Sequence, residues 1–422
     1  MIFIGISILL ATIFFLVKQY ESRMVLFVAG VAMATFAGNP MAAFDAFAKS
    51  MTTAGLIEAI CSVMGFAYVM KVTGCDTHLI NLVAKGLARV RPILIPGATL
   101  ATFAINIALP SAAGCAAAVG AIFIPILIAS GVRPAIAGAA VWAGTFGSML
   151  NPGLAHNPFI AKLANVPVMD VIAVHSNADV AAGIIAAVCI TIVAKLLKED
   201  KGYGDAKTEV AAAKGVNTVP KANLLFAIVP IIPVVLLVLG STGMLPILKK
   251  VGVPHAMLIG AIIAVLVTRK SPTDITKGFF DGMGSAYGQI MGIIIAAGVF
   301  VGGMKAIGLV DTFIQALIQS TGIVKYAATF GPFVLAVISG SGDAAAFAFN
   351  EAVTPHAAKF GLDIVNMGSI AALSGAIGRT MSPINGAGII CAAIAGVSPM
   401  ELAKRNAPGM IIATIAAMLI LL

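Results

Sequence analysis

Charged residues are scarce in this chain, and their scarcity excludes a soluble domain. Asp, Glu, Lys and Arg make up 10% of the 422 residues, whereas a soluble domain has about 25%. Hydrophobic residues make up 60%, and apolar runs of about 20 residues, long enough to cross a bilayer, recur along the whole length. The composition therefore predicts an all-α polytopic membrane protein embedded in the lipid bilayer.

The sequence also lacks the signatures of metal centres, disulfide frameworks and hydrolases. Its cysteines show no C-x-x-C spacing and lie mostly inside apolar runs, which is typical of small core thiols: Cys61, Cys75, Cys115, Cys189 and Cys391. The protease motifs G-x-S-x-G and H-E-x-x-H are missing. We expect that the protein is not an enzyme and that it binds no cofactor and no metal other than Na+. The net charge of +9 fits basic membrane loops better than a nucleic-acid partner.

An internal repeat relates the two halves of the chain. Matching residues recur roughly 230 positions apart, and duplication is the usual build of secondary transporters. The matches are Met70-Lys71-x-x-Gly74 with Met304-Lys305-x-x-Gly308; Ser111, Pro125 and Gly131 with Ser341, Pro355 and Gly361; and Gly147, Pro152 and Val166-x-x-Met169-Asp170 with Gly378, Pro383 and Val397-x-x-Met400-Glu401. We divide the chain into a first repeat (1–196), a flexible cytoplasmic linker (197–222) and a second repeat (223–422).

Each repeat is expected to hold five spans, one of them broken, and a re-entrant helical hairpin. The first repeat has expected spans at about 2–17, 24–38, 53–72, 135–165 and 174–195 and a hairpin at 92–130. The second has expected spans at about 223–240, 256–268, 286–304, 363–396 and 406–422 and a hairpin at 325–359. Because five crossings are an odd number, the second repeat is inverted relative to the first. Two amphipathic segments, 42–51 and 273–283, are expected to form interfacial arm helices.

The distribution of basic residues supports this topology. With the N-terminus outside, most of the 26 basic residues fall on the cytoplasmic side, as the positive-inside rule requires. The cytoplasmic set is Lys18, Arg23, Lys71, Lys85, Arg89, Arg91, Arg133, the six lysines from Lys195 to Lys221, Arg269, Lys270, Lys277, Lys404 and Arg405. We expect a multi-pass protein of the bacterial inner membrane with both termini in the periplasm.

Four segments rich in Gly, Pro, Ser and Asn interrupt the apolar runs at equivalent places in the two repeats. They are "ALPSAAGCAA" (108–117), "GSMLNPGLAHNP" (147–158), "SGSGDAAAFAFNE" (339–351) and "GRTMSPINGAG" (378–388). Non-helical backbone at membrane depth is tolerated only where it is buried in protein or lines a cavity. Two of the segments are expected to be hairpin tips and two to break a span, and we predict that all four meet near the bilayer midplane.

The chemistry of these segments suits an anion. Half-helices that start after Ser111 and Ser341 aim free N–H groups at the space between them, and Arg379 can bind a carboxylate in a bidentate manner. Arg379 could instead snorkel to the interface or pair with Asp343 or Glu351, but ionisable residues inside a membrane are functional by default. The predicted substrate-binding residues are Ser111, Ala113, Gly114, Asn151, Pro152, Gly340, Ser341, Gly342, Arg379, Thr380, Ser382, Pro383 and Asn385.

Asp343 is the candidate for ion coupling, with Ser341 and Asn151 beside it. One arginine facing one ionised aspartate is neutral, so a dianion needs an added Na+ or H+ to avoid an uncompensated buried charge. A strict exchanger meets the same constraint if it never crosses empty. Asp343 could also be only a helix cap, and we expect His156 to be a hydrogen-bonded scaffold residue.

At these residues the sequence resembles the anaerobic C4-dicarboxylate carriers of the DcuC type. The resemblance rests on "SGSGDAAAFAFNE", "AIGRTMSPINGAG" and "VSPMELAKR", in this order, and is strongest over 292–408. It implies a dimeric elevator transporter that moves succinate, fumarate or malate by uptake, efflux or exchange. The matching residues are Gly340, Ser341, Gly342, Gly378, Arg379, Thr380, Ser382 and Pro383. Asp343, where the family has asparagine, and the segment "LNPGLAHNP" depart from the pattern.

Two other classes remain open from the residues. A cation/proton antiporter would use the same broken helices, with Asp343 as carrier and Arg379 as its structural partner. An intramembrane aspartyl protease is suggested by the G-x-G-D pattern at Gly340–Asp343, but such a protease needs a second aspartate on a neighbouring span. The only Phe-Asp candidates, Asp45 and Asp281, lie in the expected arm helices, which disfavours the protease.

Overall fold

The architecture is known from a computed structural model that describes residues 1–422 except 54, 88–92, 204–221 and 320. Every regular element in the described residues is a helix. In the first half these are α1 (Ile2–Val17), α2 (Ser22–Phe36), α3 (Met41–Met51), α4 (Leu56–Thr73), α5 (Cys75–Leu87), α6 (Leu94–Ala108), α7 (Ala112–Ala129), α8 (Pro134–Ala143), η2 (Gly147–Leu150), α9 (His156–Ala164) and α10 (Val168–Leu196).

The second half begins with α12 (Leu224–Ile228), η3 (Val229–Ile231), α13 (Ile232–Ser241), η4 (Pro246–Lys250), α14 (Val253–Thr268), α15 (Pro272–Ala286), a π-helical turn η5 (Tyr287–Met291) and α16 (Gly292–Ala306). It continues with α17 (Leu309–Gln319), α18 (Thr321–Ser339), α19 (Gly342–Ala352), η6 (Thr354–Phe360), α20 (Ile364–Arg379), α21 (Gly386–Ala395) and α22 (Pro399–Leu421). Within the described ranges, 7 helices are long and apolar enough to cross a membrane. This agrees with the predicted all-helical polytopic membrane protein.

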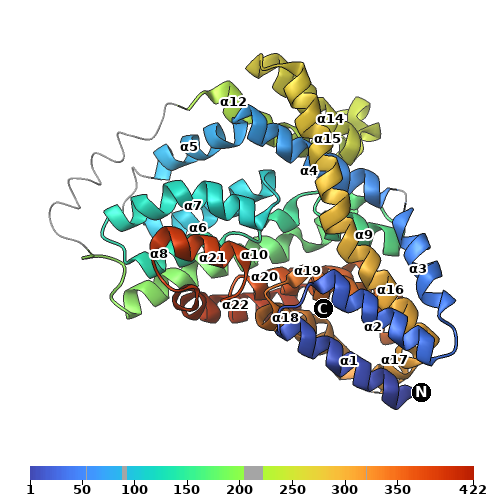
Figure 1. Ribbon diagram of the computed structural model, residues 1–422. Coiled ribbons are helices and arrows are strands. Elements are labelled where there is room, and N and C mark those ends of the chain that lie inside the picture. The colour runs from blue at the N-terminus through green and yellow to red at the C-terminus, as the bar shows by residue number, and fades with distance from the viewer. Residues whose placement is uncertain (54, 88–92, 204–221, 320) are drawn as a thin grey trace.

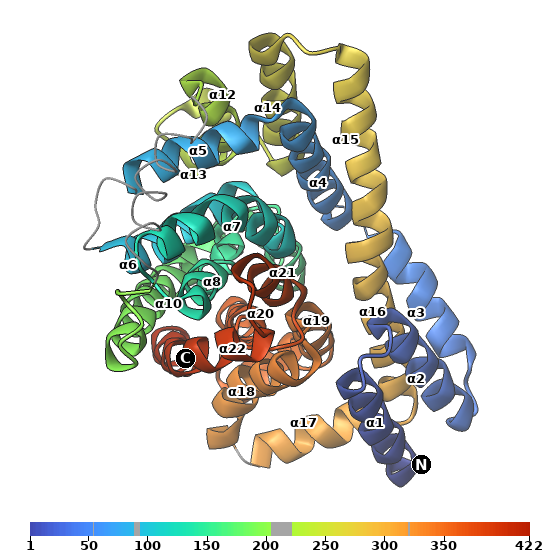
Figure 2. The same cartoon turned by 60° about the vertical axis from the view of Figure 1, so that its left-hand side comes forward.

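The helices gather into two groups (Figures 1 and 2). In the first, which we call the frame, α15 packs on α4 and α16 packs on α2 and α3. In the second, the bundle, α10 packs on α22, α18 on α20, and α21 on α7. Figure 2 shows the long α15–α16 helix passing alongside the bundle, with the bundle helices on one side of it.

Two connecting helices that the sequence analysis did not predict join the frame to the bundle. α5 contacts both α4 and α7, and α17 contacts both α16 and α18. Each follows a glycine in the left-handed region, Gly74 (φ 78°) and Gly308 (φ 79°), which ends the preceding helix because glycine lacks the Cβ that disfavours this conformation. The repeated Met-Lys-x-x-Gly motif is therefore a helix terminus followed by a connector.

The two expected arm helices differ. α3 is a separate helix, as predicted, because the chain leaves helical geometry before α4, with Gly55 at φ 75°. The second predicted arm (273–283) lies in α15, which continues into the third span as part of one 35-residue helix, Pro272–Ala306; the interfacial position of both arms stays a prediction. No Pro or left-handed Gly interrupts residues 284–291; the chain accommodates the junction with the π-helical turn Tyr287–Met291.

The helices are interrupted inside all four predicted segments. The α6–α7 and α18–α19 junctions fall at Leu109–Ser111 and Gly340–Ser341, and the broken spans are α8–η2–α9 and α20–α21. The re-entrant course of the hairpins, the inverted relation of the halves and the division at 196 and 223 stay predictions. Arg89, Arg91 and most of the predicted linker lie outside the described residues.

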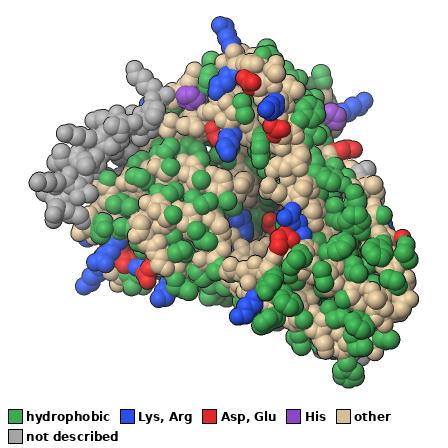
Figure 3. Space-filling view, in the orientation of Figure 1, with side chains coloured by type: hydrophobic (Ala, Val, Ile, Leu, Met, Phe, Trp, Pro, Cys, Tyr) green, Lys and Arg blue, Asp and Glu red, His purple; other side chains and the backbone are tan. Residues whose placement is uncertain are grey.

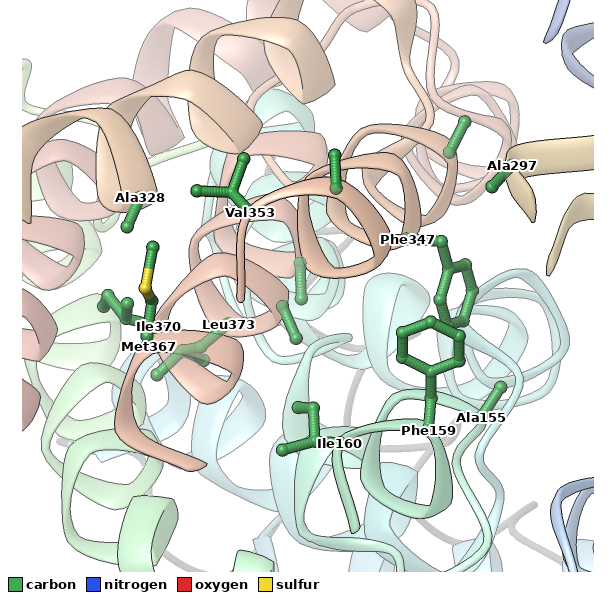
Figure 4. Packing of buried hydrophobic residues seen from close by; sticks show 14 of the residues in the cluster. Ala155, Phe159, Ile160, Ala297, Ala328, Phe347, Val353, Met367, Ile370 and Leu373 are labelled. Atoms are coloured by element: carbon green, nitrogen blue, oxygen red, sulfur yellow. The ribbon is translucent and has the colours of Figure 1, made fainter. Parts of the chain in front are cut away.

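Aromatic packing joins the first half of the bundle to the second. The rings of Phe159 (α9) and Phe347 (α19) meet edge to face with centroids 5.2 Å apart, and Figure 4 shows them beside Ala155 and Ile160 in the buried cluster. Such edge-to-face pairs add to the stability gained by burying the rings. This contact holds the first broken span against the helix that begins at the second hairpin tip.

Candidate functional site

A cavity of about 320 Å³ lies where the four broken segments meet. The bundle contributes Pro110, Ser111, Ala112, Ala113, Ser148, Met149, Gly153, Leu154, Ala155, His156, Gly340, Ser341, Gly342, Asp343, Ala376, Arg379, Asn385, Gly386 and Ala387. The frame adds Val63 and Met64 of α4 and Gln289 and Ile290 of the π-helical turn. The space-filling view shows a hollow near the middle of one face, bordered by acidic and basic side chains (Figure 3). One cavity therefore touches both groups of helices.

The two hairpin tips direct helix N-termini to this cavity. Ser111 caps α7, because its Oγ accepts a hydrogen bond from Gly114 N at 3.1 Å. At the other tip Gly340 takes φ 74°, which turns the chain into α19 at Gly342. The first N–H groups of a helix have no partner within the helix and carry its positive dipole end. The cavity therefore offers two places suited to an anionic group.

Arg379 is the last residue of α20 and lines the cavity. Its Nη2 donates to Thr145 O at 3.1 Å, which uses one of the five N–H donors of a guanidinium. Among the described residues, no ion pair within 4.0 Å joins Arg379 to Asp343 or Glu351. The structural pairing considered from the sequence is thus not present in the described part of the chain, and a carboxylate of a ligand has donors to bind.

Asp343 pairs with a histidine from the other half. Its Oδ1 lies 3.0 Å from His156 Nε2, and the side chain of Asp343 is 54% exposed whereas that of His156 is 4% exposed. The His156 ring stacks on Phe347, with centroids 4.3 Å apart and planes at 17°. Asp343 therefore faces the cavity, while His156 is held in the wall and joins the first broken span to the second hairpin tip.

The two predicted amides tie each break to the neighbouring hairpin. Asn151 Nδ2 donates to Ile107 O at 2.7 Å, and its Oδ1 accepts from Gly153 N. Asn385 Nδ2 donates to Gly340 O at 2.9 Å, and its Oδ1 accepts from Ala387 N. Both amides are thus engaged with the backbone. Asn385 also lines the cavity, whereas Asn151 lies behind it.

The other predicted residues divide into two sets. Those that line the cavity are Ser111, Ala113, Gly340, Ser341, Gly342, Asp343 and Arg379. Those that do not are Gly114, Pro152, Thr380, Ser382 and Pro383. Thr380 is fully buried, and its hydroxyl donates to Ile377 O and contacts Met410 Sδ, so the hydroxyl faces away from the cavity. The binding roles of these residues stay predictions.

Sequence reasoning missed a buried polar group behind the first break. His175 and Asp179 in α10 are fully buried, with His175 Nδ1 2.5 Å from Asp179 Oδ2, and His175 Nε2 lies 3.0 Å from Asn157 Oδ1. The signal was present: a His and an Asp four residues apart face the same side of a helix, and here they lie inside a 29-residue apolar helix. Ionisable residues at such a place are rare enough to be functional candidates.

Apolar helices of spanning length, broken helices and an anion-suited cavity are typical of membrane carriers. Residues 7–422 match the family model described as the C4-dicarboxylate anaerobic carrier, DcuC. The chain belongs to this family of anaerobic C4-dicarboxylate transporters, and it is not an enzyme. The protease-like Gly340–Asp343 pattern is therefore coincidental.

Relatives agree with this assignment. An uncharacterized transporter of Haemophilus influenzae is 46% identical over 282 residues, which are 65% of this chain and 100% of the relative. A probable anaerobic C4-dicarboxylate transporter DcuC of Vibrio cholerae is 25% identical over 435 residues, 96% of this chain and 93% of the relative. The anaerobic C4-dicarboxylate transporter DcuC of Escherichia coli K12 is 23% identical over 436 residues, 96% and 92% of the two chains.

Proposed function

We propose that this protein is a secondary active transporter that carries succinate, fumarate or malate across the bacterial inner membrane. The observation that carries the proposal is the convergence of Arg379 and two helix N-termini, after Ser111 and Ser341, on one cavity. Its volume of about 320 Å³ equals roughly ten times the volume of a water in the liquid. A four-carbon diacid fits in this space with some of its water.

The charges in the cavity support recognition of a dicarboxylate. Arg379 binds one carboxylate through its planar N–H fork. The N-terminal turn of α7, with the Ser111 and Ala113 backbone, binds the second, because a helix N-terminus favours an anion. Gly340, Ser341 and Gly342 line the cavity too and supply N–H and hydroxyl donors.

Charge balance supports coupling to a cation or to exchange. A His156–Asp343 pair that holds one proton beyond the neutral imidazole and the carboxylate has no net charge; Arg379 adds one positive charge and the substrate two negative ones. The loaded site then has one uncompensated negative charge, which is costly in a medium of low dielectric constant. We propose that H+ or Na+ enters beside Asp343 and Ser341, or that the protein exchanges one dicarboxylate for another. Asn151, whose amide is engaged with Ile107 and Gly153, acts here only by holding the hairpin.

The arrangement of the frame and the bundle supports an elevator mechanism. The bundle holds most of the cavity wall, whereas the frame touches it through α4 and the π-helical turn. We propose that the two repeats are inverted, that both termini are periplasmic, and that the bundle moves against the frame of a homodimer.

Transport into proteoliposomes tests this function. The purified protein is reconstituted with or without internal unlabelled fumarate, and uptake of radiolabelled succinate is followed under imposed Na+ or pH gradients. We expect uptake by the wild type and none by Arg379→Ala. The condition that drives uptake distinguishes symport from exchange. Absence of succinate flux under every condition, from protein that is folded, would contradict the proposal.

A cation/proton antiporter is the second candidate, and the His156–Asp343 pair is the observation that favours it. Two titratable groups 3.0 Å apart at a cavity are suited to binding a proton or a cation in alternation. Arg379→Lys separates the candidates. Lysine keeps the charge but loses the bidentate fork, so a dicarboxylate carrier loses most uptake, while a cation antiporter keeps its exchange.

A further inference from the structure

α10 and α22 pack on each other, and the predicted repeat makes them equivalent helices of the two halves. The repeat places Met169-Asp170 opposite Met400-Glu401. The same spacing places His175 opposite Asn406, and Asp179 opposite Met410. His175 and Asp179 lie behind the broken span of the first half, and Asn406 and Met410 lie behind that of the second.

In the first half, the contact runs from His175 through Asn157. Asn157 Nδ2 donates to Met149 O at 2.7 Å and to Asn151 O at 2.9 Å. Its Oδ1 lies 3.0 Å from His175 Nε2. Met149 lines the cavity, so the Asn157 amide holds the backbone of the cavity wall from behind.

The hydrogen bonds fix the protonation of the histidine. Because the Asn157 amide nitrogen faces two carbonyls, its oxygen faces His175, and Nε2 must carry a proton to donate. A single proton then lies between His175 Nδ1 and Asp179 Oδ2, which makes the buried pair neutral as a whole. Asp179 thereby keeps the imidazole in the orientation and protonation state that Asn157 requires.

In the second half, the same task is performed by neutral groups. Asn406 Nδ2 donates to Thr380 O at 3.0 Å. The Thr380 hydroxyl, which donates to Ile377 O, lies against Met410 Sδ. Thr380 directly follows Arg379, so these contacts fix the end of α20 from which the arginine projects. A neutral counterpart at the equivalent place indicates that holding the break, and not carrying charge, is the shared role.

We propose that His175 with Asp179, and Asn406 with Met410, are positioning residues that hold the two breaks in the geometry that binds substrate. The proposal rests on the proposed transport function. Since both His175 and Asp179 are 0% exposed and neither lines the cavity, the pair acts through Asn157 and the Met149–Asn151 backbone.

The test measures KM and maximal rate of succinate transport for matched variants. His175→Leu with Asp179→Val removes both polar groups together, which avoids leaving one charge buried alone. We expect this double variant to raise KM about tenfold, as expected from loss of one hydrogen bond in the wall, with a smaller change in maximal rate. Asp179→Asn can still donate to Nδ1 and is expected to keep KM within about twofold of wild type.

Asn406→Leu is expected to raise KM as the double variant does, because it removes the hydrogen bond from Asn406 to Thr380 O. Asn177→Leu, on the exposed side of α10, is the control and should leave KM unchanged. An unchanged KM in the double variant would overturn the proposal. So would loss of gradient-driven uptake in Asp179→Asn with exchange retained, since the pair would then carry the coupled proton.

A second measurement keeps this inference separate from the transport function. Ser148 lines the cavity, and Ser148→Cys, in a chain with Cys189→Ser, reports on the first break by its rate of thiol labelling. We expect faster labelling when the double variant is added, whether or not the protein carries succinate. Equal labelling rates would overturn the proposed positioning role of His175 and Asp179, whereas absence of wild-type succinate flux would overturn only the proposed function.

Discussion

Two breaks line one cavity, the first between α8 and α9 and the second between α20 and α21. Each has a glycine backed by the hairpin of the same half: a Cβ on Gly147 would lie 2.1 Å from Phe103 O, and one on Gly378 would lie 2.5 Å from Phe333 O. Both are tied to a hairpin carbonyl by an asparagine. The residue after the glycine differs, Ser148 in the first and Arg379 in the second. The two breaks therefore share these backbone contacts, but only the second places an arginine at the cavity.

The comparison teaches that two breaks with similar backbone contacts can present different charges to one cavity. The first half supplies neutral donors and His156, which reaches across to Asp343, while the second half supplies Arg379 and Asp343. Backbone geometry is shared by the two halves because the same glycine and asparagine contacts recur. Charge is specified by a few side chains that differ between them.

The largest expected effect comes from removing the charge that distinguishes the second break. Arg379→Ala should reduce succinate transport at least about a hundredfold, because a bidentate charge-assisted contact contributes more than a neutral one. Ser148→Ala, at the equivalent position, should change it less than about threefold. Both are measured as initial uptake rates in proteoliposomes, with thermal unfolding as the check on folding. Equal losses in the two variants would contradict the asymmetry.

Replacing Asp343, the acidic partner of His156, should separate substrate binding from ion coupling. Asp343→Asn keeps a hydrogen-bonding group beside His156 but cannot be ionised, so gradient-driven succinate uptake should fall about tenfold or more, as loss of a charged contact would give. Exchange between internal and external dicarboxylate should be less affected. The measurement compares the two modes in one preparation. Equal reduction of both would argue for a role in substrate binding.

The shared glycines predict equal destabilisation of the two halves. Gly147→Ala and Gly378→Ala each force a Cβ against a backbone carbonyl, and overpacking of this kind costs about 1–3 kcal/mol. Gly386→Ala, where no atom lies within 4 Å of the added Cβ, is the control. Thermal unfolding in detergent gives the melting temperature of each of these three variants. A normal melting temperature for either first variant would show that its break is free to shift.

The smallest expected effect on transport concerns the asparagines. Asn151→Ala and Asn385→Ala leave Ile107 O and Gly340 O without their donors, and each should lower stability by about 1–3 kcal/mol. Asn385→Ala should also raise KM slightly, because Asn385 lines the cavity and Asn151 does not. A matched increase in KM for both would place Asn151 in contact with substrate after all.

The breaks could be predicted from sequence because Gly, Pro, Ser and Asn act locally. The interruptions at Leu109–Ser111 and Gly340–Ser341 fall inside the expected segments, since the residues that end a helix are in the sequence itself. The continuity of α15 and α16 was missed because no local residue marks a π-helical turn. The sequence also does not predict which hydroxyls face the cavity. Thr380 and Ser341 look alike in sequence, and only tertiary packing turns Thr380 toward Met410.

The π-helical turn at Tyr287–Met291 also sets the rotational phase of the longest helix in the described residues. Its Gly288 carbonyl accepts from Arg23 Nη1 at 2.7 Å, and Tyr287 Oη donates to Met51 O at 3.0 Å. One extra residue rotates everything beyond it by about 100° relative to an uninterrupted α-helix. The stripe that packs on α4 and the stripe that packs on α2 are thereby turned relative to each other, and the turn between them carries Gln289 and Ile290 to the cavity.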